Sequence, residues 1–162
     1  MLERFYAVLT PPVEQRMFDL HLDTRQLVTL ASIIEKEARL PAERPLIASV
    51  FYNRLAVGMP LQSDPTAQYN LTGEQERAVT AVHAASAFNT YAIAGLPPGP
   101  IANPGRSSIE AALYPAHTDY LYFVARNDGT HVFSRSFKEH QLAIHQIALT
   151  DQKRIAAATK RR

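Results

Sequence analysis

Two glutamates on one predicted helix are the side chains of this chain best suited to acid–base chemistry. Side chains rotate by about 100° per residue around an α-helix, so Glu35 and Glu37 lie roughly 80° to either side of the apolar stripe, and Lys36 points outward. Glu35 shares its flank with Val28 and Ala31. A carboxyl group half-buried there loses hydration, which raises its pKa and suits it to donate a proton near neutral pH. On helical geometry alone, the favoured alternative is a solvated glutamate at the rim of a surface helix.

The helix that carries these glutamates is predicted to begin after Asp23. Asp23 is a good N-cap, and Gln26 follows at the spacing of a capping box. Pro41 ends this helix, and Pro45 fits the first turn of a second one that stops at Gly58. Apolar residues recur at helical spacing in both segments: Leu27, Leu30, Ala31, Ile34 and Ala38 in the first, and Leu46, Ile47, Val50, Phe51 and Leu55 in the second.

The remaining segments predict a lead-in, a long loop and a second cluster of elements. Residues 1–22 form a lead-in broken at Pro11–Pro12, and most of residues 59–106, which show little periodicity outside 76–85, reads as a proline-rich ordered loop. A Ser-x-x-Glu capping box at Ser107 and Glu110 predicts a short helix that ends before Pro115. Two strands are predicted at 120–126 and 130–134, with a turn at 127–129 between them. A final helix is predicted from about residue 137 onward. We therefore expect one α+β domain over 1–162, with 142–162 as a C-terminal helix and basic tail.

Composition narrows the classes of function. A chain of 162 residues with 46% hydrophobic and 20% charged residues suits a single globular domain. The absence of cysteine excludes disulfides, thiolate metal sites and cysteine nucleophiles. The net charge is only +2, and the basic cluster is confined to the tail, whereas a nucleic-acid-binding protein needs a basic stripe with stacking aromatics. No apolar run approaches the roughly 20 residues of a membrane helix.

Several sequence blocks resemble one bacterial family in order and spacing. They are Leu30-Ala31-Ser32-Ile33-Ile34-Glu35-Lys36-Glu37, the run 47–55 (IASVFYNRL), 58–66 (GMPLQSDPT), 88–91 (FNTY), 95–105 (GLPPGPIANPG), 120–125 (YLYFVA) and 129–134 (GTHVFS). Together they resemble the catalytic domain of the endolytic murein transglycosylases, the YceG-like or MltG proteins, over about residues 24–141. Ser63 stands where threonine is usual in this family, and Phe88 where tyrosine is usual.

The resemblance implies a lytic transglycosylase that acts on peptidoglycan glycan strands. Such an enzyme cleaves the β-1,4 bond between N-acetylmuramic acid and N-acetylglucosamine and leaves a 1,6-anhydro ring, because the sugar's own 6-hydroxyl attacks in place of water. The catalytic glutamate of the family's first block falls on Glu35, which would act as general acid and then as base. One carboxyl suffices when the nucleophile is tethered, and the sequence places no second carboxylate beside Glu35. The resemblance implies no cofactor.

Other residues in these blocks carry the hydrogen-bonding groups that an acetamido sugar needs, although each could equally brace a loop. The candidates for substrate binding are Asn53, Gln62, Asp64, Asn89, Tyr91, Asn103 and His131. His131 is expected to bond substrate, to orient Glu35, or to make a structural hydrogen bond. His140 and His145 lack a third ligand in helical register, so no metal site is predicted.

Full-length members of the family carry an N-terminal membrane helix and a LysM-like segment, neither of which is recognisable here. We expect the chain to be a piece of such a protein, acting in the periplasm or at the outer face of the cytoplasmic membrane, with a peptidoglycan synthase as a further partner. A non-catalytic glycan-binding module stays open as the alternative. An older label of the family, a pyridoxal-phosphate-dependent lyase, is disfavoured because Lys36 faces outward and no phosphate-binding loop is present.

Overall fold

The computed structural model describes residues 10–69, 71 and 85–159. Its elements are α2 (Pro11–Asp19), α3 (Thr24–Glu37), the 3₁₀ helix η1 (Pro41–Glu43), α4 (Arg44–Ala56), α5 (Asp64–Gln68), α7 (Arg106–Leu113), β1 (Tyr122–Ala125), β2 (His131–Ser134) and α8 (Phe137–Thr159). Helices combined with an antiparallel hairpin confirm the predicted α+β class. No helix of the described ranges is long and apolar enough to span a membrane.

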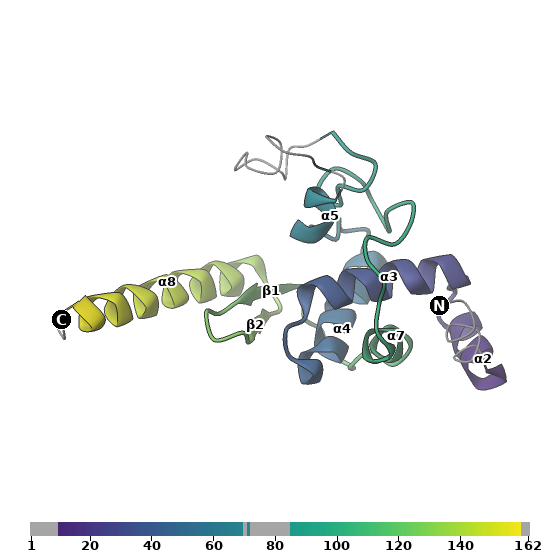
Figure 1. Cartoon of the computed structure of the whole chain (residues 1–162), viewed down its shortest axis with the longest axis horizontal. Coiled ribbons are helices and arrows are strands. Elements are labelled where there is room, and N and C mark those ends of the chain that lie inside the picture. The colour runs from purple at the N-terminus through teal and green to yellow at the C-terminus, as the bar shows by residue number, and fades with distance from the viewer. Residues whose placement is uncertain (1–9, 70, 72–84, 160–162) are drawn as a thin grey trace.

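Helix α3 is the central element, and it packs against α4 and α7 (Figure 1). The predicted capping box is present at its start, where the side chain of Asp23 accepts the backbone N–H of Gln26 and the Gln26 side chain accepts that of Asp23. The second half of α3 is buried over residues 30–34, so it is covered on both flanks and not along one stripe alone. Whatever covers each flank therefore decides the environment of Glu35 and Glu37.

The core gathers apolar side chains from α3, α4 and α7. Each fully buried leucine, isoleucine or phenylalanine contributes about 1.5–3 kcal/mol relative to an exposed one. The largest of these side chains are Leu27, Leu30, Ile33, Ile34, Ile47, Phe51 and Leu113. The core therefore fixes the axis of α3 relative to α4 and α7.

The hairpin joins this core to the long helix α8. Strands β1 and β2 pair antiparallel with Phe123 opposite Phe133, and the turn uses Gly129 at a φ of 86°. The Phe123 ring meets Phe51 of the core edge-on at 5.9 Å. Helix α8 packs on the hairpin along much of its length, with Asp151 accepting a hydrogen bond from Asn127 of the turn, and its C-terminal end points away from the rest of the fold (Figure 1).

Two local predictions are wrong, and the segment read mostly as loop includes one short helix. Pro11–Pro12 begin α2 instead of breaking the chain, because a helix's first residues have no backbone acceptor for their N–H groups and tolerate proline. The predicted loop contains α5, which starts at Asp64. The capping box at Ser107 and Glu110 is absent, and Gly105 is the N-cap of α7. Residues 1–9, 70, 72–84 and 160–162, which include parts of the predicted lead-in, loop and basic tail, lie outside the described residues.

Candidate active site

Glu35 is bound to the start of α7. Its Oε2 accepts a 2.7 Å hydrogen bond from the hydroxyl of Ser108 and a 3.1 Å bond from the backbone N–H of Gly105. The guanidinium of Arg44 lies 3.7 Å from Oε1 and also donates to the Ser108 hydroxyl at 2.9 Å. The side chain remains 31% exposed. Glu35 thus ties α3 to α7 and to the end of the proline-rich loop.

These donors set the charge of Glu35. The hydrogen bond from Ser108 lowers the pKa of Glu35, and the Gly105 N–H and the Arg44 charge lower it further, against a smaller rise from burial. The expectation that burial raises the pKa of Glu35 is therefore wrong, because donors and not apolar groups cover this flank. These donors therefore favour the charged form of Glu35, which is the opposite of the bias that a general acid needs.

Glu37 has the environment that was expected for Glu35. Its Oε1 accepts a 2.6 Å hydrogen bond from the hydroxyl of Ser63, which is 1% exposed. Burial raises the pKa of Glu37, and the nearby Asp64 carboxylate raises it further, while Ser63 and His131 act in the opposite direction. Glu37 is thus a partly buried carboxyl biased toward keeping its proton, on the opposite flank of α3 from Glu35.

Two loop segments hold Ser63 under Glu37. The backbone N–H of Ser63 donates to Oγ1 of Thr90 at 3.0 Å, and the N–H of Gln62 donates to the Thr90 carbonyl at 3.1 Å. The hydroxyls of Thr66 and Thr90 lie 2.7 Å apart, and both residues are fully buried. These contacts bind the segment before α5 to residues 88–91, so the two sequence blocks form one platform.

Asp64 and Tyr91 lie at the exposed edge of this platform. The Tyr91 hydroxyl donates a 2.5 Å hydrogen bond to Oδ1 of Asp64. Burial raises the pKa of Tyr91, and the neighbouring Asp64 and Glu37 carboxylates raise it further, so the phenol stays a donor. The backbone N–H of Tyr91 donates to Oδ1 of the fully buried Asn89 at 3.0 Å. Asn89 therefore shapes the loop that presents Tyr91.

Arg54 is a residue that the sequence analysis did not single out. Its guanidinium is buried and donates to the carbonyls of Leu121, Pro60 and Leu61 and to Oε1 of Gln62, at 2.6 to 3.1 Å. It lies 5.2 Å from the centre of the Tyr122 ring. Its position three residues after Phe51, on the buried stripe of α4, is the sequence signal that marks it. Arg54 anchors both the hairpin and the segment that leads to Ser63.

His131 pairs with Glu43. Its Nδ1 lies 2.7 Å from Oε2 of Glu43, and its backbone N–H donates to Oε1 at 3.0 Å. The two side chains are 5% and 14% exposed. Of the three roles expected for His131, the structure shows the hydrogen bond that fastens β2 to η1, and it shows no bond to Glu35. Sequence reasoning missed Glu43, whose partner is 88 positions away.

The remaining predicted residues fall into two kinds. Asn53 donates from Nδ2 to the carbonyls of Thr118 and Tyr120, at 2.9 Å each, and so braces the segment before β1. Asn103 and Gln62 are exposed. Gln62 has a φ of 52°, a conformation uncommon for a residue with a side chain, which the loop contacts enforce. In the described part of the chain, no three histidine, aspartate or glutamate side chains gather as a metal site.

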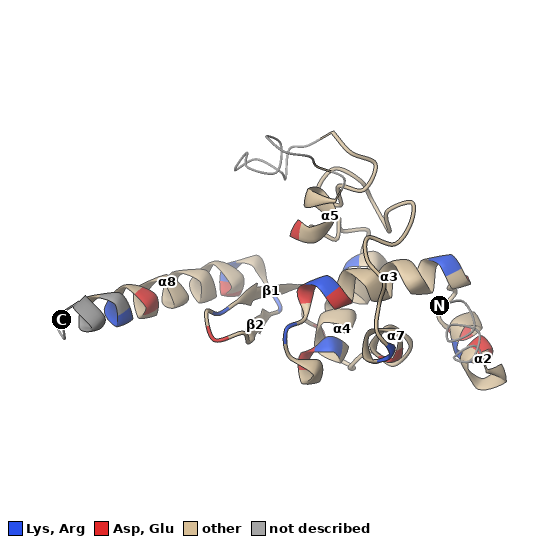
Figure 2. Cartoon of the chain, viewed as in Figure 1, with Lys and Arg blue, Asp and Glu red and all other residues tan. Residues whose placement is uncertain are grey.

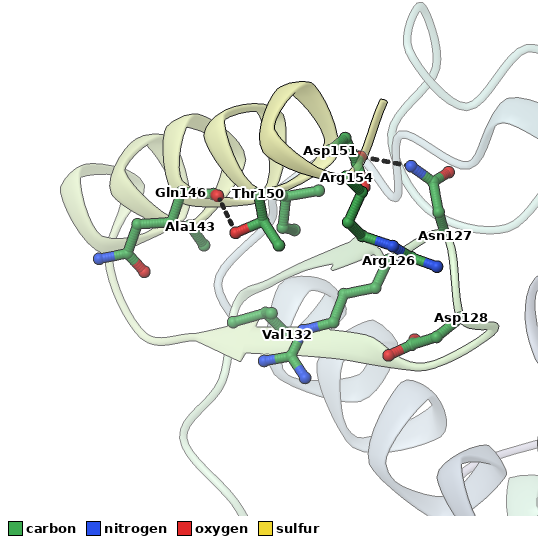
Figure 3. A pocket seen from close by; sticks show the side chains of 10 residues that line it. Arg126, Asn127, Asp128, Val132, Ala143, Gln146, Thr150, Asp151 and Arg154 are labelled. Atoms are coloured by element: carbon green, nitrogen blue, oxygen red, sulfur yellow. Dashed lines mark hydrogen bonds between the residues drawn. The ribbon is translucent and has the colours of Figure 1, made fainter. Parts of the chain in front are cut away.

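Two hollows lie elsewhere on the molecule. One, of about 330 Å³, separates the hairpin turn from α8, and its wall mixes the charges of Arg126, Asp128, Asp151 and Arg154 (Figure 3). Another, of about 440 Å³, lies between the first turns of α3 and residues 95–98. None of the predicted site residues lines either hollow. Figure 2 shows that acidic and basic residues gather at the end of α3 and on the turn that leads from α3 to α4.

Comparison with known proteins agrees with the sequence blocks. The family model of the YceG-like family matches residues 1–146. The endolytic murein transglycosylase of Bacillus subtilis (strain 168) is 50% identical over 123 residues, which are 75% of this chain and 34% of that protein. The protein of the same name from Streptococcus pneumoniae serotype 2 is 35% identical over 128 residues, 74% of this chain and 23% of that one. This chain thus spans about a third or less of the relatives' length.

A solved structure extends the match to three dimensions. The crystal structure of a YceG-like protein from Listeria monocytogenes superposes with a TM-score of 0.72 at 45% sequence identity, covering 81% of this chain and 42% of that one. The residues matched by the family model include Glu35, Glu37 and the loop platform. The chain therefore belongs to the YceG-like family.

Proposed function

We propose that this chain is the catalytic part of a lytic transglycosylase that cleaves the bond between N-acetylmuramic acid and N-acetylglucosamine in peptidoglycan glycan strands. The relatives named endolytic murein transglycosylase support this reaction class. The observation that carries the proposal is the environment of Glu37, a partly buried carboxyl whose pKa is raised and which accepts a hydrogen bond from Ser63. A protonated carboxyl of this kind is what protonation of a glycosidic oxygen requires.

We assign the general acid to Glu37 in place of Glu35. Glu35 is bound by Ser108, Gly105 and Arg44, which stabilise its anion. A group that must first donate a proton needs the opposite bias, and Glu37 has it. Glu35 then has the role of holding the end of the proline-rich loop against α3.

The reaction proceeds without a water molecule. Glu37 gives its proton to the oxygen that leaves with N-acetylglucosamine, and the bond from that oxygen to C1 of N-acetylmuramic acid breaks with its electron pair going to the oxygen. The 6-hydroxyl oxygen of the same muramic sugar then bonds to C1 and closes the 1,6-anhydro ring. Its proton passes to the Glu37 carboxylate, which restores the acid for the next cycle.

Substrate binding falls to the exposed members of the predicted set. Gln62, Asp64, Tyr91 and Asn103 have side chains at or near the surface, whereas Asn53, Asn89 and His131 are engaged inside the protein. The substrate places the reaction on the outer side of the cytoplasmic membrane. A synthase partner and a membrane anchor in the longer protein are part of the same proposal.

The test compares Glu37→Gln with Glu35→Gln on purified glycan strands. Mass spectrometry should find 1,6-anhydro-muramyl ends with the unaltered chain. Glu37→Gln removes the transferable proton and should lower turnover by about 10²–10⁴-fold while strand binding persists. Glu35→Gln should keep a larger share of the rate and lower the melting temperature. Normal turnover of Glu37→Gln would remove our assignment, and binding without turnover by the unaltered chain would favour a glycan-binding module.

A hydrolase is the second candidate, because Asp64 contributes a second carboxylate close to Glu37. Glycosidases that release hydrolysed ends use such a pair, one residue as acid and the other as nucleophile or base. Reaction in ¹⁸O-labelled water separates the two chemistries. A hydrolase incorporates label into a reducing muramic end, whereas a transglycosylase leaves an unlabelled anhydro end.

A further inference from the structure

Asp64 is a carboxylate of the site with one oxygen fixed and the other available. Oδ1 accepts the 2.5 Å hydrogen bond from Tyr91, and Oδ2 has no hydrogen-bond partner among the described residues. Asp64 is exposed, and it directly follows Ser63, the residue bonded to Glu37. The site therefore presents a partly buried acid and an exposed carboxylate side by side.

The support behind Asp64 is rigid. Tyr91 is fixed at its backbone by Asn89, and the adjacent Thr90 is bonded to Ser63 and Thr66. The raised pKa of Tyr91 keeps its hydroxyl protonated across the working pH range, so the bond to Asp64 persists. Tyr91, and through it Asp64, is therefore held by the buried part of the platform.

The proposed reaction creates a demand for an anion at this place. As the bond to the leaving oxygen breaks, positive charge develops on C1 and the ring oxygen of the muramic sugar. A fixed negative charge that is already in position stabilises that charge without the cost of reorganising solvent. Glu37 becomes anionic only as it gives up its proton, and it takes another proton from the 6-hydroxyl, so it does not supply an anion that is fixed in advance.

Resting on the proposed function, we propose that Asp64, positioned by Tyr91, is a second catalytic carboxylate, whose free oxygen faces the anomeric centre and stabilises the positive charge formed there. Asp64 forms no covalent bond and takes no proton, so the proton and electron balance of the reaction is unchanged. Tyr91 acts through Asp64 and is a positioning residue.

The same geometry links Asp64 to the titration of Glu37. The groups that act on Glu37 come from three elements: Ser63 and Asp64 from the segment entering α5, Tyr91 from the loop at 88–91, and His131 from β2. Asp64 is the negative charge that raises the pKa of Glu37 among them. Removing that charge should therefore lower the pKa of Glu37 and move the alkaline limb of the pH–rate profile to lower pH.

The experiment uses Asp64→Asn, which keeps an oxygen to accept from Tyr91 and removes only the charge. We expect kcat on purified glycan strands to fall by about 10²–10³-fold, with KM changed by only a few-fold. The alkaline limb should shift to lower pH, and the melting temperature should stay near that of the unaltered chain. Asp19→Asn is the matched control, since Asp19 bonds Gln15 on α2 and should leave the rate unchanged.

The outcomes separate this proposal from the proposed function. If the unaltered chain makes anhydro ends and Glu37→Gln abolishes them, while Asp64→Asn keeps a normal kcat, the role of Asp64 is overturned and the transglycosylase stands. A loss of rate with an unshifted alkaline limb and a lowered melting temperature would make Asp64 a brace, which also overturns it. If Asp64→Asn fails to fold, Tyr91→Phe decides: a fall in kcat at constant KM supports the proposal, and an unchanged kcat contradicts it.

Discussion

Glu35 and Glu37 are two residues apart on α3, yet their carboxylates belong to separate hydrogen-bond networks. Oε2 of Glu35 accepts from Ser108 of α7, and Oε1 of Glu37 accepts from Ser63 before α5. A separation of two positions turns the side chains roughly 160–200° apart around the helix, so each meets a different layer of the fold. One helix thus carries a carboxyl whose charged form is stabilised by donors, and another whose pKa is raised by burial.

Glu35→Gln should destabilise the fold at neutral pH by about 1–2 kcal/mol, because the hydrogen bonds from Ser108 and Gly105 lose a charged acceptor. The pKa of Glu35 is lowered in the folded state, so its contribution is present above the unfolded value of about 4.3 and is lost as pH falls through the lower folded value. Urea unfolding at pH 7 and pH 3 measures this difference between variant and unaltered chain.

The matched control for this variant is Glu110→Gln. Glu110 pairs with Arg106 on the exposed face of α7, where a single ion pair contributes little. If Glu35→Gln is no less stable than Glu110→Gln at pH 7, the proposal that Glu35 stabilises the contact between α3 and α7 is contradicted. If Glu35→Gln destabilises the fold equally at pH 7 and pH 3, the charge of the Glu35 carboxylate does not contribute to stability.

Ser63→Ala removes the hydrogen bond that favours the Glu37 carboxylate, so the pKa of Glu37 should rise further. The alkaline limb of the pH–rate profile should move to higher pH, and the maximal rate should fall by about tenfold, the effect of roughly 1.4 kcal/mol. Ser63→Thr keeps the hydroxyl and should keep both the limb and most of the rate. Steady-state kinetics from pH 5 to pH 9 on purified strands checks this pair. Identical profiles for the two variants would contradict a role for the hydroxyl.

Arg54→Lys should destabilise the fold by about 2–4 kcal/mol. One ammonium group cannot replace the guanidinium N–H groups that donate to Leu121, Leu61 and Gln62. Buried carbonyls would then lose their donors. Thermal unfolding measures the loss. Arg25→Lys is the control, because Arg25 donates to the single carbonyl of Pro98 at an exposed site. An Arg54→Lys melting temperature close to that of Arg25→Lys would contradict the anchor role.

The sequence predicts those features that depend on neighbouring residues. The capping box of Asp23 and Gln26 and the hairpin turn at Gly129 are confirmed, because the atoms that form each one lie within a few positions. Helical geometry also places Glu35 and Glu37 on different flanks of α3. Short-range patterns thus predict most of the elements and the flank of α3 on which each glutamate lies, although they fail at the start of α7, where the expected capping box is absent.

The sequence does not predict what covers each flank. The partner of Glu37 is 26 positions away, and the Ser108 partner of Glu35 is 73 positions away. These distant residues determine whether a carboxyl is surrounded by hydrogen-bond donors or is buried away from water. Donors lower its pKa and burial raises it, so the direction of the shift also depends on these residues. The prediction that burial raises the pKa of Glu35 failed at this step, whereas burial does raise the pKa of Glu37.

His131→Gln should shift the alkaline limb in the direction opposite to Asp64→Asn. The imidazole of His131 lowers the pKa of Glu37, so its removal should raise that pKa and move the limb to higher pH, while a weaker acid lowers the maximal rate. Glutamine keeps a donor for Glu43, which limits the structural loss. pH–rate profiles of the two single variants and of the double variant provide the measurement. Because Asp64 and His131 act on the pKa of Glu37 in opposite directions, the double variant should return toward the alkaline limb of the unaltered chain. Two shifts in the same direction would contradict the assignment of Glu37 as the titrating acid.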